Sequence, residues 1–359
     1  MPQKIIIVGG GIIGAMAAYR LTQQGANVTV VDAGHARATD ASFSWINASF
    51  FTDDAYFRLR TEGITAFGRL GNTLDVPVTS HGSIVWEDEG PAFDRQLHRL
   101  NRLGADVRVI DGQAITALES AIMQPPERAM FFPSEIAVDS TALVTSLLAA
   151  ASAAGARMLS GVFVQGVTQT GDRVTGITTS VGAIPADQVI VATGVGTQVL
   201  LAGIGLSLPM LKRPGLMMRT RPIAQTIRHI IASPTQEFRQ LPNGAILAPV
   251  SAGHQADTSS EIMRPPDVLA DAAIIRLRAM LPDADLEWDQ VMLADRPMPQ
   301  DGLPAVGAIG PAGLYVATMH SGITLAAIMG ELIMTEVLDG VSAKSADLLA
   351  AYRPKRFGV

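Results

Sequence analysis

Three glycines near the start of the chain, followed by one acidic residue, form the pattern with the clearest chemistry. Gly9, Gly11 and Gly14 have G-x-G-x-x-G spacing. Gly9 permits a tight turn, Gly11 lets a pyrophosphate approach the backbone, and Gly14 allows a helix to pack closely on a strand. Asp32 lies about twenty residues further on, where an acid accepts hydrogen bonds from an adenosine ribose and repels a 2′-phosphate. The pattern predicts a dinucleotide site and disfavours NADP.

The segments around these residues are those that such a site needs. Residues 5–8 are a β-branched run without alternation, which is typical of a strand buried on both faces of a parallel sheet. Residues 15–24 favour a helix that ends at Gly25, and residues 27–31 form a second strand that ends at Asp32. The helix N-terminus, with its unpaired N–H groups and positive dipole, would therefore face the anion.

Composition limits the class of protein. The 359 residues are 48% hydrophobic and 17% charged, which suffices for a large core in two domains or one large one. The net charge of −6 and the lack of a basic run argue against nucleic-acid binding. The absence of cysteine excludes disulfides, thiolate catalysis, cysteine-ligated clusters and thioether flavin attachment. We assign no metal site.

The chain shows neither a signal-peptide pattern nor an apolar stretch long enough to cross a bilayer. The absence of cysteine fits a reducing compartment. We therefore expect a cytoplasmic protein, and peripheral contact with the inner face of a membrane stays open.

The segments that follow predict further helices and an antiparallel sheet. Residues 33–51 read as a loop that enters a helix at an N-cap on Ser42 or Ser44, and we expect Arg58 and Arg60, in the helix that follows, to be surface charges. A second helix should begin at an N-cap on Asp139 or Ser140. Residues 210–291 are rich in proline and short strand candidates, which indicates an antiparallel sheet with a helix.

Several motifs in order give the chain a resemblance to a known family. They are IIIVGGGIIG with Asp32, DASFSWINA, ADQVIVATG, RPMPQDGLPAVG, LYVATMHSGITLA and the closing AYRPKRF. The chain resembles the FAD-dependent amino-acid oxidoreductases, which include D-amino-acid dehydrogenases and oxidases, glycine oxidase and sarcosine oxidase. The resemblance implies an α/β fold, α+β overall, with a Rossmann-like FAD-binding domain and a discontinuous substrate domain on an antiparallel sheet. The FAD-binding domain would comprise residues 1–78, 138–204 and 296–359, and the substrate domain residues 79–137 and 205–295.

The resemblance also implies contacts with a non-covalent FAD, since sarcosine oxidases attach theirs through a cysteine that this chain lacks. The implied cofactor-binding residues are Gly9, Gly11, Ile12, Ile13, Gly14, Asp32, Ala33, Ala41, Ser42, Asn47, Val164, Thr193, Gly194, Gly322, Ile323, Thr324 and Leu325. Among them, Val164 matches the position whose backbone touches the adenine. The run from Gly322 would place a helix N-terminus near the flavin pyrimidine ring, which gains negative charge on reduction.

Two residues carry the catalytic hypothesis. Arg296 matches the family arginine that pairs with the substrate carboxylate, a task suited to its planar bidentate guanidinium. The alternative for Arg296 is a structural salt bridge. His320 stands where glycine-oxidase relatives tend to have an arginine, which argues against glycine as substrate and leaves a structural role open. His254 and Tyr56 have no motif support, and we expect them to be structural or at the surface.

The predicted function is flavin-dependent oxidation of the C–N bond of a small amino acid, with a D-amino acid as the favoured substrate. Hydride transfer from Cα to FAD N5 would leave an imine that hydrolyses to a keto acid. The electron acceptor would be oxygen, a quinone or a partner protein. The alternatives are a secondary amine, imino acid, opine or 2-hydroxy acid as substrate, including as a subunit of a dehydrogenase complex, an NAD-linked dehydrogenase, and a non-catalytic flavin-binding subunit.

Overall fold

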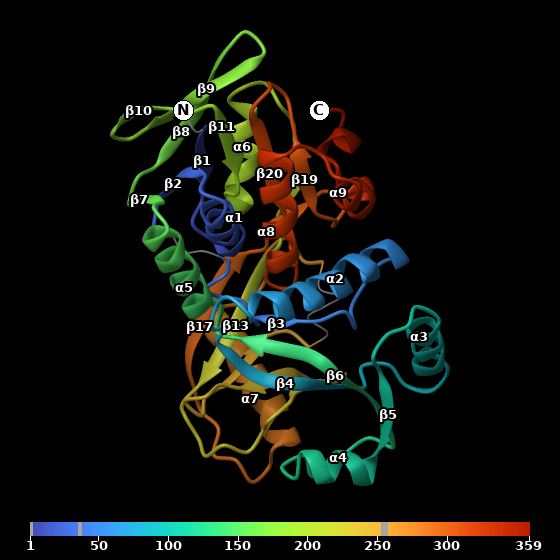
Figure 1. The fold of residues 1–359 in the computed structure, drawn as a ribbon. Helices are drawn as coiled ribbons and strands as arrows, with labels where there is room; N and C mark the ends of the chain where they lie inside the picture. Colours follow the sequence, from blue (N-terminus) through green and yellow to red (C-terminus); the bar gives the residue numbers. More distant parts are fainter. Residues whose placement is uncertain (1–2, 35–37, 253–257) are drawn as a thin grey trace.

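A twisted parallel sheet forms the upper part of the molecule in Figure 1. The structure is a computed structural model that describes residues 3–34, 38–252 and 258–359. The sheet has the order β19-β20-β11-β1-β2-β7, in which every pair is parallel except β19 with β20. Its strands are β1 (Lys4–Val8), β2 (Asn27–Asp32), β7 (Arg157–Ser160), β11 (Gln188–Val191), β19 (Ala305–Ala308) and β20 (Leu314–Thr318). Residues 5–8 are each at most 3% exposed, because both faces of β1 are covered.

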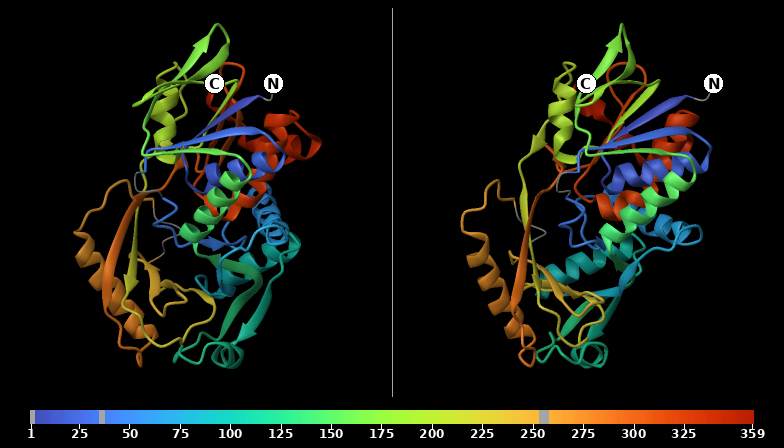
Figure 2. Two further views of the ribbon diagram at one scale, coloured as in Figure 1. Left: turned by 60° about the vertical axis from the view of Figure 1, so that its left-hand side comes forward. Right: turned by 90° about the vertical axis from the view of Figure 1, so that its left-hand side faces the viewer.

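Helices cover one face of the parallel sheet and a small sheet covers the other. On the first face α1 (Ile12–Gln23) packs between α5 (Ser140–Ala153) and α8 (Gly322–Leu338). The small antiparallel sheet of β8 (Val164–Thr170), β9 (Arg173–Thr179) and β10 (Gly182–Pro185) packs on the second face with α6 (Thr197–Ala202), which follows the 3-10 turn η1 (Gly194–Gly196). Figure 2 shows its outer hairpin projecting from the molecule. This layering confirms the predicted α/β class. Across the described residues, no helix has both the length and the apolar character that a membrane crossing requires.

A larger, mostly antiparallel sheet forms the lower part of the molecule in Figure 1. Its order is β17-β13-β16-β15-β14-β4-β6-β3, and β5 pairs with β6. Its strands are β3 (Trp45–Ile46), β4 (Val78–Val85), β5 (Arg108–Asp111), β6 (Arg128–Val138), β13 (Pro214–Thr220), β14 (Ile230–Ala232), β15 (Glu237–Gln240), β16 (Ile246–Pro249) and β17 (Trp288–Asp295). The parallel pair β4–β14 joins the two distant stretches of chain into one sheet. The domain boundaries given above remain our proposal.

Helices also cover the large sheet. Helix α7 (Pro266–Met280) buries Ala270, Ala273 and Leu277 in a core shared with β13 and β16, and Figure 2 shows this helix along the outside of the sheet. Helices α3 (Gly90–Arg102) and α4 (Gly112–Leu118) lie in the connections between β4 and β6.

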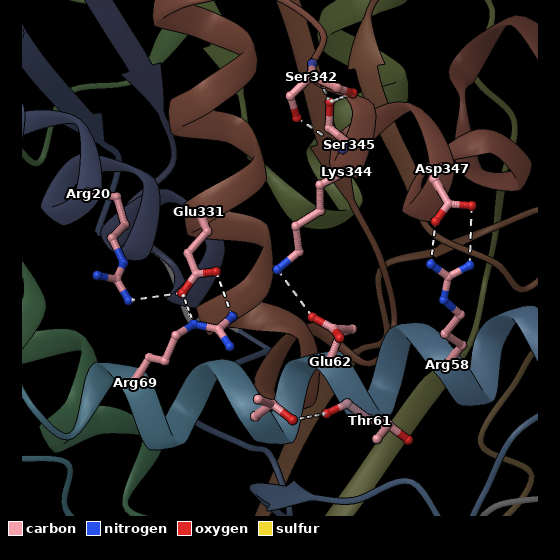
Figure 3. A network of polar contacts seen from close by, with 11 residues as sticks. Arg20, Arg58, Thr61, Glu62, Arg69, Glu331, Ser342, Lys344, Ser345 and Asp347 are labelled. Carbon is pink, nitrogen blue, oxygen red and sulfur yellow. Dashed lines mark hydrogen bonds and ion pairs between the residues drawn. The ribbon is translucent and has the colours of Figure 1, made fainter. Parts of the chain in front are cut away.

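Two features connect the sheets. The strands β12 (Met210–Leu211) and β18 (Met298–Pro299) pair where the chain passes to the large sheet and returns. Helix α2 (Asp54–Leu70) crosses the middle of the molecule below α8 (Figure 1). Ion pairs fasten α2 to the C-terminal helices: Arg69 to Glu331 on α8 at 2.7 Å, Glu62 to Lys344 at 3.2 Å, and Arg58 to Asp347 (Figure 3). Lys344 and Asp347 belong to α9 (Ala343–Leu348), after which the short 3-10 turns η3 (Ala350–Tyr352) and η4 (Pro354–Phe357) complete the chain.

The helix caps separate a wrong prediction from a confirmed one. Helix α2 begins at Asp54, and its N-cap Asp53 accepts a hydrogen bond from the Tyr56 amide at 2.8 Å, so the predicted caps at Ser42 and Ser44 are wrong. The reason is that β3 lies in this segment and pairs with β6 before the helix can start. Asp139 caps α5 through the Ala142 amide at 2.9 Å, as one of the two predicted choices.

Candidate active site

A cavity with an empty volume of about 780 Å³, partly open to solvent, is lined by residues from the large sheet, from α2 and α8, and from the loops that join them. Gly215 and Met217 belong to β13, Arg60 to α2, and Thr324 to α8. The predicted site residues among its lining are Ala41, Ser42, Asn47, Arg296, His320, Ile323 and Thr324. The structure thus brings together residues almost 300 positions apart in the sequence, from Ala41 to Thr324.

The opening glycines have the geometry that their predicted roles require. Gly9 has a φ of +106°, and a Cβ there would lie 2.5 Å from the carbonyl oxygen of Ala192. A Cβ at Gly14 would lie 1.9 Å from the carbonyl oxygen of Gly9, so only glycine allows α1 to approach β1 this closely. A Cβ at Gly11 would meet only the Thr39 hydroxyl, at 3.6 Å, among the described residues. The space beside Gly11 fits a diphosphate approaching the α1 N-terminus.

Asp32 lies at the end of β2 beside the same turn. Its carboxylate accepts hydrogen bonds from the Gly10 amide at 2.5 Å and the Gly34 amide at 2.9 Å. Asp32 also lines a second cavity, together with Met158 and Ser160. The Val162 amide donates to the Asp32 carbonyl at 3.1 Å, so β8, which begins at Val164, starts close to Asp32. Ala33 follows Asp32 directly, and these residues fit an adenosine end.

The later glycine turns meet the first one. Gly194, in η1, accepts a hydrogen bond from the Thr318 hydroxyl at 3.4 Å, and Thr193 is the residue before it. A Cβ at Gly322 would lie 3.6 Å from Ile12 Cγ2 and 3.8 Å from Ile13 Cγ1. The N-terminal turns of α1 and α8 are therefore neighbours, and neither N-cap residue provides a side-chain cap within the described chain. Two uncapped helix N-termini at one place suit an anionic ligand such as FAD.

Leu325 was predicted to bind the cofactor, but its side chain packs in the core and does not line the cavity. Its side chain is completely buried in the core with α1, and its amide donates to the Ser321 carbonyl at 3.1 Å. Only its backbone can therefore serve the first turn of α8.

The loop that carries Ala41, Ser42 and Asn47 is anchored to the large sheet by buried charges. Glu135 on β6 accepts hydrogen bonds from the amides of Ala48 and Ser49, both at 2.9 Å. Burial raises the pKa of the Glu135 carboxyl. Arg239 on β15 donates to the Phe43 carbonyl at 2.8 Å, and burial lowers the pKa of its guanidinium to about 10. The Glu135 carboxyl and the Arg239 guanidinium can be buried because several hydrogen bonds satisfy each of them.

The parallel-sheet side anchors the same loop through hydroxyl groups. The Thr39 hydroxyl accepts from the Ile12 amide at 3.2 Å, and the Thr324 hydroxyl donates to the Trp45 carbonyl at 3.0 Å. Ser44 has a φ of +59°, the left-handed region that a non-glycine residue adopts at a cost in free energy. Its hydroxyl donates to the Ser140 hydroxyl at 2.8 Å, which holds this conformation.

Arg296 follows β17 and lies in the cavity wall with 8% of its surface exposed. Its amide donates to the Arg213 carbonyl at 2.8 Å, and its guanidinium donates to the carbonyls of Arg213 and Pro214 at 3.4 and 3.3 Å. These main-chain contacts fix the side chain in place. A planar guanidinium held in this way can bind a carboxylate through two hydrogen bonds.

His320 also lines the cavity, in the turn between β20 and α8. Tyr56 is buried and packs against the ring of Tyr352 with 6.1 Å between ring centroids, in agreement with a structural role. His254 lies outside the described residues.

Arg60 lines the cavity with 4% of its surface exposed. The prediction that it is a surface charge is therefore wrong. The helical spacing of Arg60 could have revealed this, because Tyr56 lies four, Gly63 three and Phe67 seven residues away, on the same buried face of α2.

Comparisons with known proteins identify a family and its cofactor. Residues 4–335 match the family model described as "FAD dependent oxidoreductase". The chain is 26% identical over 99% of its length to the bifunctional protein ThiO/ThiG of Nostoc sp., and spans 55% of that longer protein. It is 23% identical to the D-amino acid dehydrogenase of Paramagnetospirillum magneticum, covering 98% of both chains. Its fold matches the crystal structure of L-proline dehydrogenase from P. horikoshii with a TM-score of 0.86, at 20% identity over 100% of this chain and 99% of the other.

Proposed function

The chain belongs to the family of FAD dependent oxidoreductases, and from this premise we propose that it oxidises the C–N bond of a small D-amino acid. FAD-dependent oxidation of an amino acid or amine is the chemistry of this family. The D-form is supported by two D-amino acid dehydrogenases, 23% and 24% identical, that match at least 96% of this chain. In this proposal the product imine is hydrolysed to a keto acid and ammonia.

The placement of Arg296 is the observation that carries the proposal. This buried arginine lies in the wall of the cavity onto which the turn before α8 also opens. It would bind the substrate carboxylate, and the contacts of its guanidinium with the carbonyls of Arg213 and Pro214 would fix the orientation of the bound amino acid.

The other residues of the cavity would hold the cofactor and shield the reacting atoms. When bound, FAD supplies the acceptor for the hydride that leaves Cα. Gly9, Gly11 and Gly14 would hold its diphosphate, Asp32 its ribose, and the first turn of α8 its ring system. The walls at Phe43, Trp45 and Met217 are apolar and would exclude water from the reacting bond. His320 lines the same cavity as Arg296 and is proposed to contact the substrate.

The substitution Arg296→Ala tests the docking role. We expect KM for amino acids to rise about a hundredfold, because loss of a bidentate charged contact costs about 2–5 kcal/mol, while flavin absorbance stays. Arg219→Ala is the matched control, since Arg219 lies on β13 of the same sheet but forms a surface ion pair with Asp289 at 3.5 Å. Unchanged KM in Arg296→Ala would refute the role.

The substrate class is tested by anaerobic bleaching of the flavin. The panel contains D- and L-amino acids, N-methyl amino acids, imino acids and 2-hydroxy acids. Bleaching by D-amino acids alone supports the proposal, whereas bleaching only by secondary amines or hydroxy acids supports the alternative substrate classes. An oxygen electrode and an acceptor dye then separate an oxidase from a dehydrogenase.

A further inference from the structure

Arg60 connects two segments of the cavity wall that are far apart in the sequence, at Asn47 and at Ser321. Its Nε donates to the Asn47 carbonyl at 3.0 Å, and its Nη2 donates to the Asn47 side-chain oxygen. Its Nη1 donates to the Ser321 hydroxyl at 2.7 Å. The guanidinium also lies over the Tyr56 ring, 5.3 Å from its centroid. Arg60 is thereby held in one orientation with 4% of its surface exposed.

Arg60 is a buried cation at the N-terminus of a helix. Its hydrogen-bond acceptors are all neutral, and no carboxylate of the described chain forms an ion pair with it. Ser321 is the N-cap of α8, so the guanidinium lies at the positive end of a helix dipole, where cations are unfavourable. Helix α2 approaches this turn so closely that a Cβ at Gly63 would lie 2.5 Å from the Thr324 carbonyl oxygen.

Two sources of positive potential, Arg60 and the α8 N-terminus, therefore act on the part of the cavity wall at Ser321. Burial of a charge costs free energy unless an opposite charge or strong hydrogen bonds compensate it. A ligand that carries negative charge in the cavity would relieve the repulsion between Arg60 and the α8 N-terminus. The flavin ring system gains negative charge on reduction, so fixed positive charge favours its reduced form.

We propose that Arg60 raises the reduction potential of the FAD bound in this cavity. It does so by placing a permanent cation beside the α8 N-terminus, where hydrogen bonds to Asn47 and Ser321 hold the guanidinium in one orientation. This inference rests on the cofactor of the proposed function but not on its amino-acid substrate.

The experiment measures the two-electron potential of bound FAD and the Kd of sulfite, which adds to the flavin and places negative charge on its ring. We expect Arg60→Gln to weaken sulfite binding about tenfold and lower the potential by about 30 mV. Arg60→Lys should retain most of both values, because it keeps the charge. Arg58→Gln is the control, since Arg58 lies on the same helix with its side chain 58% exposed and paired with Asp347.

Several outcomes would overturn the inference. If Arg60→Gln changes only KM for carboxylated amines, Arg60 binds substrate and does not tune the flavin. If Arg60→Gln does not retain FAD, Ser321→Ala is the second test, because it removes one hydrogen bond and keeps the charge of Arg60. A tenfold loss of sulfite affinity in Ser321→Ala would refute the role of charge, and an unchanged sulfite affinity supports that role. Both readouts use no amine, so they are independent of the substrate panel.

Discussion

The two large sheets differ in what they bury. The parallel sheet and its helices form apolar clusters, and the strands β1, β2, β11 and β20 bury no charged side chain among the described residues. The half built on the large sheet buries the charged residues Glu119, Glu135, Glu237, Arg239 and Arg296. The half that would hold the cofactor therefore relies mainly on backbone groups and close packing, with Arg60 on α2 as a buried cation, and the half that would bind the substrate relies on several fixed charges. The two halves should fail in different ways when mutated.

Close packing predicts the largest effect, at Gly14. Alanine there would place a Cβ 1.9 Å from the Gly9 carbonyl oxygen, so α1 must move from β1. We expect Gly14→Ala to abolish FAD binding and to lower the free energy of unfolding by about 3 kcal/mol or more. Thermal unfolding and flavin absorbance measure both. Gly68→Ala is the control, because its Cβ would contact nothing within 4 Å, and it should stabilise α2 by about 0.5–1 kcal/mol.

The buried charges predict the next effect, at Glu135. Alanine would leave the Ala48 and Ser49 amides and the Ser83 hydroxyl, which donates to Glu135 at 2.6 Å, without their acceptor. We expect Glu135→Ala to cost about 3 kcal/mol in urea unfolding. Glu135→Gln keeps one acceptor oxygen and should cost less. Equal losses in the two variants would contradict the role of the hydrogen bonds.

Glu87, which follows β4, gives a smaller effect that depends on pH. Burial and then the nearby Glu237 raise the pKa of Glu87 from 4.5 to about 8. Because the pKa of Glu87 is higher in the folded than in the unfolded protein, this residue contributes to the free energy of unfolding in full below about pH 4.5. The contribution is lost as the pH rises to about 8. Glu87→Gln should therefore be more stable than the parent at pH 9 by about 1–2 kcal/mol, since partial exposure reduces the effect. Melting curves from pH 5 to 9 test this, and a constant difference in Tm would refute it.

Gly215 gives the smallest effect and sharpens the contrast with Gly14. A Cβ at Gly215 would lie 3.6 Å from Arg296 Nε and 3.7 Å from the Ala294 carbonyl oxygen, which is ordinary contact. We expect Gly215→Ala to leave stability and FAD binding unchanged and to narrow the cavity. KM for amino acids with large side chains should rise severalfold while that for small ones stays. Loss of FAD would contradict the assignment of this wall to substrate.

The sequence predicted the parts of the fold that depend on neighbouring residues. The run at residues 5–8 and the glycines after it are local features, and the structure has them as expected. The parallel pair β4–β14 joins residues almost 150 positions apart, and no local pattern encodes such a pairing. Arg60 was misplaced because charged residues are usually exposed, and Glu135 was missed because its partners come from a different strand and loop.

The ribbon of β12 and β18 has a consequence for how this molecule can change. The chain leaves at Met210–Leu211 and returns at Met298–Pro299, and the Gln300 amide donates to the Pro209 carbonyl at 2.9 Å beside that pair. Arg296 lies just before the return strand. Arg213 and Pro214, at the start of the inserted stretch, hold the Arg296 guanidinium at its end, and Pro214 pairs with Asp295. Insertions or deletions in the loops further along this stretch can therefore leave the guanidinium in place.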